Sequence, residues 1–261
     1  MADVRYTDDE LERAKEFLRE RIRNEQSMEA DVETLLEEYA KYILKAMSEG
    51  ASEEDLYLLI EDLISRLMED CRILAIDEHE GKDEILPLIF EDEEGDTIEN
   101  KVRRRAMTFL DELTAVYSAG DILDIDDKTI LSSVIESLDH PWDNELLNDV
   151  REKINRGEVD EDIEFYEERH YGQGVPISSK LDIELITVGA IVSTWNEWSW
   201  REAFNNKAKG YYIERGSSYP CSECDSHTGV FYPINDKSHL PQYHRNCRCV
   251  AVYVYDDDDI I

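Results

Sequence analysis

The chain has 261 residues, of which 63 are Asp or Glu and 28 are Lys or Arg, so its formal net charge is −35. Its 41% apolar content is enough to build a core, but the sequence has no apolar run of about 18 residues, so we expect no transmembrane helix. An acidic surface of this kind favours solubility or a basic partner, and it makes direct binding to nucleic acid unlikely.

The negative charge is concentrated in the first 200 residues. Residues 201–255 carry seven Lys or Arg and five Asp or Glu, and the tail Asp256–Asp259 adds four acids, so residues 1–200 hold −33 of the net charge. Residues 1–30 are highly charged and lack an apolar core segment, so we expect no secretory signal there. We therefore expect a reducing cytoplasm, which disfavours disulfides.

Apolar residues at steps of three and four predict amphipathic helices over most of the N-terminal half. The expected helices cover residues 7–22 (capped by Thr7), 28–48, 52–67 (started by Ser52-x-x-Asp55), 97–118 (capped by Thr97), 127–138 and 143–155. The acidic segment 77–97 is predicted to be a loop that can hold a short strand at 86–90. These helices have short connections, so we expect an acidic helical bundle over residues 1–156.

Two polar clusters in this region have open interpretations. Lys101, Arg103, Arg104 and Arg105 form its one basic cluster, which can pair with neighbouring carboxylates or contact a phosphate. The aspartates of residues 121–127 lack the glycine and the final glutamate of a calcium loop, so we interpret them as a turn with a helix cap.

The C-terminal part has a different organisation. Residues 157–180 are predicted to be a linker, and residues 181–209 a long helix that carries Trp195, Trp198 and Trp200 as core residues or as anchors for a partner. Strands are expected at 211–214, 230–233 and 249–255. The predicted fold is therefore mainly α, with a helical bundle, a long helix and a small zinc-stapled α+β module within residues 181–261.

Four of the five cysteines lie within 29 residues, as a C-x2-C pair and a C-x-C pair with 22 residues between them. Two such pairs on a turn and a returning hairpin are typical of a tetrahedral zinc site. The candidate ligands are Cys221 and Cys224 with two of His244, Cys247 and Cys249. Reduced structural thiols and disulfides are the alternatives. His227 and His239 are predicted to lie on the surface, and Cys71 to be a buried apolar thiol.

The same stretch resembles a known family. C-x2-C, the hairpin residues Gly229–Pro233, and the block His244-Arg245-Asn246-Cys247-Arg248-Cys249 are similar to the C-terminal signature of the Mu F-like phage minor head proteins, also called head morphogenesis proteins. Arg245 stands where the family usually has proline. The preceding helix around residues 202–208 matches loosely, and the resemblance covers about residues 180–255.

The resemblance implies a phage structural protein that acts at the portal vertex during head morphogenesis. Its expected partner is a portal or capsid protein, and its expected location is the virion (capsid interior or portal vertex), reached from the host cytoplasm. The chain has none of the G-x-S-x-G, P-loop, G-x-G-x-x-G or H-E-x-x-H patterns, so we expect no enzymatic activity.

Two alternative functions stay open. One is a cytoplasmic zinc-binding adaptor. The other is a zinc-anchored nuclease or toxin in which His227, His239 or His244 would act as the base, although only 12 residues follow Cys249 and we expect no separate toxin domain there. No sequence pattern indicates the oligomeric state.

Overall fold

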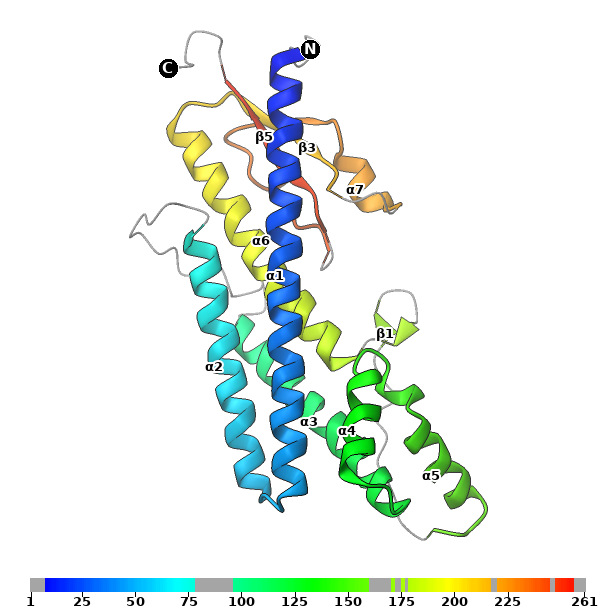
Figure 1. The fold of residues 1–261 in the computed structure, drawn as a ribbon. Helices are drawn as coiled ribbons and strands as arrows, with labels where there is room; N and C mark the ends of the chain where they lie inside the picture. The colour runs from blue at the N-terminus through cyan, green and yellow to red at the C-terminus, as the bar shows by residue number, and fades with distance from the viewer. Residues whose placement is uncertain are drawn as a thin grey trace. The chain divides into compact units, whose positions relative to one another are not determined.

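The computed structural model describes residues 8–77, 96–159, 170–171, 175–176, 178–216, 220–244 and 247–255. It confirms the predicted class, because the described residues are mainly helical with a small antiparallel sheet (Figure 1). The helices are α1 (Asp8–Ser48), α2 (Glu53–Asp77), α3 (Ile98–Ile122), α4 (Asp127–Glu136), the 3-10 turn η1 (Pro141–Asp143), α5 (Glu145–Asn155), α6 (Ser179–Asn205) and α7 (Ser222–His227). The strands are β1 (His170–Tyr171), β2 (Val175–Pro176), β3 (Gly210–Glu214), β4 (Phe231–Pro233) and β5 (Val250–Val254).

The chain divides into two compact units, and each is discontinuous in sequence. The helical unit comprises Asp31–Asp70 and Glu91–Thr187, and the sheet unit comprises Met1–Ala30, Cys71–Phe90 and Val188–Ile261. This division differs from the boundaries expected at residues 156 and 180. The physical reason is helix length: at 1.5 Å per residue α1 is about 60 Å long, so one helix supplies residues to both units, as α2 and α6 also do.

The predicted break between residues 22 and 28 is wrong, because α1 is one continuous helix of 41 residues. Its inner face includes Arg21, Glu25, Met28 and Val32, all buried and spaced by four, three and four residues. The helical repeat therefore continues through two charged residues, which a pattern of apolar residues alone does not detect. Thr7, the predicted cap, lies outside the described residues.

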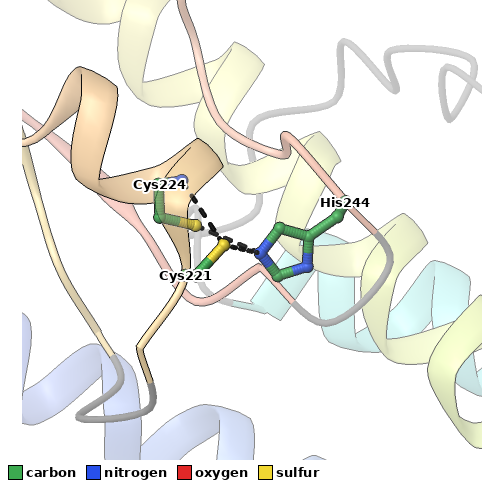
Figure 2. Close-up of side chains that lie close together, drawn as sticks. All are labelled: Cys221, Cys224 and His244. Carbon is green, nitrogen blue, oxygen red and sulfur yellow. Dashed lines mark hydrogen bonds between the residues drawn. The ribbon is translucent and has the colours of Figure 1, made fainter. Parts of the chain in front are cut away.

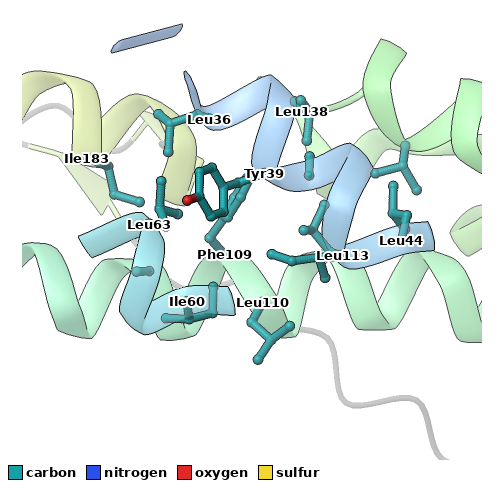
Figure 3. Close-up of a cluster of buried hydrophobic side chains, with 14 of the residues drawn as sticks. Leu36, Tyr39, Leu44, Ile60, Leu63, Phe109, Leu110, Leu113, Leu138 and Ile183 are labelled. Atoms are coloured by element: carbon teal, nitrogen blue, oxygen red, sulfur yellow. The ribbon is translucent and has the colours of Figure 1, made fainter. Parts of the chain in front are cut away.

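The helical unit is built on apolar side chains from α1 to α6, as Figure 3 shows around Tyr39 and Phe109. The caps predicted from sequence are confirmed. The Ser52 hydroxyl accepts from the Asp55 amide at 3.2 Å, and Asp55 accepts from the Ser52 amide at 3.1 Å. Thr97 caps α3 and Asp126 caps α4 in the same way. Gly50, with a φ of +79°, closes α1.

The basic cluster on α3 forms the predicted internal ion pairs. Arg103 pairs with Glu61 and Glu99, Arg104 pairs with Asp96, and Arg105 pairs with Asp182 of α6. Arg103, Arg104 and Arg105 therefore already have carboxylate partners within the chain. This arrangement supports the salt-bridge interpretation over a phosphate contact.

The sheet unit contains a three-stranded antiparallel sheet in the order β4-β3-β5. Tyr211 of β3 lies opposite Tyr232 of β4 and Tyr253 of β5. The three predicted strands are thus confirmed. The expectation that strands occur only around 211–255, apart from a possible short strand at 86–90, is wrong, because β1 and β2 form a two-residue antiparallel pair inside the predicted linker. Short extended pairs of this size lack the length that an alternating pattern needs to be recognised.

The tryptophans of α6 differ in exposure. Trp195 is buried, with 3% of its surface exposed. Trp198 and Trp200 are half-buried, and the Trp200 indole N–H donates to the Ile234 carbonyl at 2.9 Å. Trp195 and Trp200 therefore have the structural role that the sequence suggested as one of two possibilities.

Several sequence predictions fall outside the described residues: the loop at 78–95 with its possible strand at 86–90, most of the linker at 160–177, and the acidic tail. Within the described helices, none combines the length and the hydrophobicity that crossing a membrane requires.

Candidate metal centre

The C-x2-C pair is positioned by the first turn of α7. Cys221 is the N-cap residue of this helix, and its Sγ accepts a hydrogen bond from the Cys224 amide at 3.4 Å. An N-cap side chain and the residue three positions later both lie at the open end of the helix. The two-residue spacing thus brings both thiols to one side of a single turn.

The second half of the cluster comes from the segment that leads into β5. The Cys247 amide donates to the His244 carbonyl at 2.9 Å, which closes a turn between them. Cys247 and Cys249 are both buried against the sheet, with 1% and 2% of their surfaces exposed. In a chain where side chains alternate, the C-x-C spacing places both thiols on the same side.

All five predicted ligands meet in this place. His244 Nε2 lies 3.3 Å from Cys221 Sγ and 3.1 Å from Cys224 Sγ, as Figure 2 shows. Cys224 Sγ lies 3.8 Å from Cys247 Sγ. The donor atoms form two triads, Cys221–Cys224–His244 and Cys224–Cys247–Cys249, in each of which all atoms lie within 4.8 Å of one another. Cys224 belongs to both.

These separations fit a small tetrahedral metal ion. Zinc–sulfur bonds of about 2.3 Å and zinc–nitrogen bonds of about 2.0 Å place neighbouring donors about 3.8 Å apart for two sulfurs and about 3.5 Å apart for sulfur and nitrogen. The pair Cys224–Cys247 and the pair Cys221–His244 lie close to these values. The cluster can therefore hold a metal ion.

The thiols differ in their protonation. Burial raises the pKa of Cys224 to about 12. A hydrogen bond from Cys249 lowers the pKa of Cys247 to about 5, and the same bond together with burial raises the pKa of Cys249. Without a metal, the cluster thus favours one thiolate and keeps neighbouring thiols protonated. Metal binding would have to release those protons.

The geometry of the cysteines bears on the two alternatives to a metal site, which are disulfides and reduced structural thiols. All five cysteines are free thiols, so the structure contains neither of the disulfides considered from sequence. Cys71 is buried apart from the cluster, as predicted. Neither triad includes a carboxylate, and a catalytic zinc site commonly combines its ligands with a carboxylate base and an open position.

His227 and His239 are both half-buried, so each imidazole keeps part of its surface exposed, and 37% of the His239 side chain is exposed. The His227 ring stacks on Tyr243 with centroids 4.0 Å apart, and the His239 ring stacks on Tyr232 at 4.2 Å. His227 Nδ1 also lies 2.9 Å from the Tyr232 hydroxyl. Both imidazoles are part of an aromatic layer on the module and belong to neither triad. Sequence spacing does not indicate a stack of this kind, because its four rings come from separate turns.

Sequence reasoning also missed a role for Arg248, the residue between Cys247 and Cys249. Its guanidinium forms ion pairs with Glu25 and Glu29 of α1. In the sequence, the one signal for this role is the position of Arg248 between two candidate ligands. Comparison with protein-family models, curated proteins and solved structures finds no match for this chain, so the resemblance to the Mu F-like family rests on the motif residues themselves.

Proposed function

We propose that this protein is a non-enzymatic structural protein of a phage head, a minor head protein that acts at the portal vertex during head morphogenesis. The observation that carries the proposal is the meeting of Cys221, Cys224, His244, Cys247 and Cys249 in one cluster. These are the residues by which the sequence resembles the Mu F-like family. The acidic body agrees with a protein that docks on other proteins rather than on DNA.

In this proposal the metal is zinc, and its ligands are Cys221, Cys224, His244 and Cys247. The 3.8 Å separation of Cys224 and Cys247 favours Cys247 as the fourth ligand. Cys249 then donates a hydrogen bond to the Cys247 sulfur, which supports the ligand without binding the metal. Zinc supplies a cross-link between the α7 turn and the segment before β5, and it takes no part in a reaction.

The ligand assignment is tested by elemental analysis of full-length protein purified under reducing conditions with zinc supplied. We expect about one zinc per chain. Cys247→Ser should lose most of the metal, whereas Cys249→Ser should keep it. The opposite result would exchange the roles of the two thiols, and the absence of metal from the unaltered protein would contradict the zinc staple.

The assembly role is tested by co-expression with a phage portal protein, followed by affinity purification. We expect the two proteins to purify together, and we expect Cys224→Ser to weaken the complex. A zinc-loaded protein that binds neither portal nor capsid proteins would instead indicate a cytoplasmic adaptor. DNA cleavage that His244→Ala abolishes without unfolding the protein would establish the nuclease alternative.

A further inference from the structure

A charged contact connects the cysteine cluster to the first part of α1. Nη1 of Arg248 lies 3.0 Å from Oε2 of Glu25, and the other terminal nitrogen of Arg248 pairs with Glu29. The Glu25 side chain is 2% exposed, while that of Arg248 is 20% exposed. A buried carboxylate is unfavourable unless it is paired, so the position of Glu25 depends on cations that are held near it.

A second arginine contacts the same carboxylate. Arg21 lies one turn before Glu25, with its Nε 3.8 Å from Oε1 of Glu25, and its side chain is 3% exposed. Its guanidinium also lies over the Trp195 ring of α6, 4.0 Å from the ring centroid. Glu25 is therefore placed between a cation of its own helix and a cation from the cysteine segment. Of these two cations, Arg248 is the one that belongs to the cysteine segment.

The backbone of Arg248 has little freedom to move independently of the cluster. Its two neighbours in sequence are Cys247 and Cys249, both buried. Gly216 lies so close to its carbonyl oxygen that a Cβ at this glycine would overlap it. A rigidly held backbone lowers the entropy cost of fixing the long arginine side chain on its two carboxylates. A metal ion bound by Cys247, whose sulfur accepts a hydrogen bond from Cys249, would fix this backbone further.

We infer that Arg248 couples metal binding to the docking of residues 16–30 of α1 on the sheet unit. This inference rests on the proposed metal binding and adds to it. The metal orders the C-x-C segment, the ordered segment presents Arg248 to Glu25 and Glu29, and these ion pairs hold the helix. Arg248 is a positioning residue in this scheme, because its guanidinium is not a metal ligand.

Coupling of this kind is reciprocal. If the metal strengthens the docking of α1, then docking must strengthen metal binding by the same factor. Substitutions in α1, far in sequence from the cysteines, are therefore expected to change the metal affinity. A merely structural salt bridge would change stability and leave the metal affinity as it is.

The first test measures zinc affinity of the full-length protein by competition with a chromophoric chelator. We expect Arg248→Gln and Glu25→Gln each to weaken zinc binding by about 5- to 100-fold. Arg248→Lys keeps the charge but loses the two-pronged geometry, so its loss should be intermediate. Arg201→Gln is the matched control, because Arg201 pairs with Glu197 within α6 rather than with α1.

The second test follows amide hydrogen exchange in zinc-loaded and chelator-treated protein. Zinc should slow exchange in residues 16–30 at least about 10-fold, and Arg248→Gln should remove this difference while the amides of α3 stay unchanged. Equal exchange in residues 16–30 with and without bound zinc would overturn the coupling and leave the proposed function intact. A protein that binds no zinc would instead contradict the proposed function itself.

Discussion

The buried clusters of the helical unit and of the sheet unit consist of different types of side chain. Among the described residues, the core of the helical unit has 24 buried side chains, and all of them are apolar residues other than cysteine. The buried cluster around the sheet has six, and three of these are the thiols of Cys224, Cys247 and Cys249. The helical unit can therefore be stabilised by burial alone, whereas the cluster around the sheet has half of its buried side chains in groups that can bind a metal.

One chain can thus combine a core that apolar burial stabilises with a smaller cluster that a metal ion can stabilise. The strands β3, β4 and β5 have five, three and five residues, and a sheet of this size buries little apolar surface. A structural metal is a common way to stabilise so small a core. Substitutions in each unit test whether the two units differ in their dependence on a bound metal.

Loss of the metal should have the largest effect and should be confined to the sheet unit. Cys224→Ser removes the one thiol that belongs to both triads. Binding of a structural zinc contributes on the order of 10 kcal/mol, so we expect the amide protection of β3 and β5 to disappear while the far-ultraviolet helical signal is largely kept. The control is Cys71→Ala, which alters a buried thiol apart from the cluster. Full metal content and an intact sheet in Cys224→Ser would remove the contrast between the units.

Truncation of a side chain in the helical core should destabilise the helical unit and leave the metal content unchanged. Phe109 is 1% exposed, and Phe109→Ala should lower the free energy of unfolding of the helical unit by about 3–5 kcal/mol. Urea denaturation followed by circular dichroism measures this loss, and elemental analysis should still find the metal. Leu58→Ala, at a side chain that is 68% exposed, should change stability by less than about 0.5 kcal/mol. A parallel loss of metal in Phe109→Ala would show that the units are not independent.

A smaller effect is expected where α3 and α4 approach each other closely. A Cβ on Gly120 would overlap the side chain of Ile130, so Gly120→Ala should lower the free energy of unfolding by about 2–3 kcal/mol. The same change made in an Ile130→Ala background should cost much less, because the truncated side chain leaves room for the new methyl group. Equal losses of unfolding free energy in the two backgrounds would mean that the contact between Gly120 and Ile130 does not limit the packing of α3 on α4.

The smallest predicted effect concerns pH. Burial raises the pKa of Glu112 to about 7, although its carboxylate accepts hydrogen bonds from Ser179. The folded state thus binds a proton that the unfolded chain releases near its ordinary pKa. This stabilisation is complete below about pH 4.5 and is lost as the pH rises through about 7.

Glu112→Gln should therefore flatten the dependence of unfolding free energy on pH between about 5 and 7.5, by about 1–2 kcal/mol relative to the unaltered protein. Urea titrations at a series of pH values measure the slope. Burial also raises the pKa of Glu184 to about 7, so part of the slope should persist. An unchanged slope would indicate that Glu112 titrates as an ordinary carboxyl group.

Local features of this fold were predictable from sequence, and distant partners were not. Ser52, Thr97 and Asp126 cap their helices as expected, because capping depends on residues within one turn. The C-x2-C and C-x-C spacings likewise brought the right thiols together. The continuity of α1 through Arg21 and Glu25 was missed because these buried positions hold charged residues, and Glu25 has a partner, Arg248, that lies 223 residues later in the sequence.

The same reasoning applies to two further features that no sequence pattern indicated. The division into two units follows from α1, α2 and α6 each serving two cores, and amphipathic periodicity says nothing about which core a given turn of helix joins. The half-buried state of His227 and His239 comes from stacking on Tyr243 and Tyr232. Such stacking depends on the positions of separate loops rather than on any local pattern.

The discontinuity of the sheet unit has a consequence for the order of events on the ribosome. Residues 8–30 are synthesised before the rest of their unit, and the largest part of that unit begins at Val188, which emerges only after the helical unit. Bringing Glu25 to Arg248 closes a loop of more than two hundred residues, and such closures are slow compared with helix formation. The helical unit would thus be complete while the first turns of α1 still lack their partners, and translation that stops before residue 248 would yield a folded body without its metal-binding part.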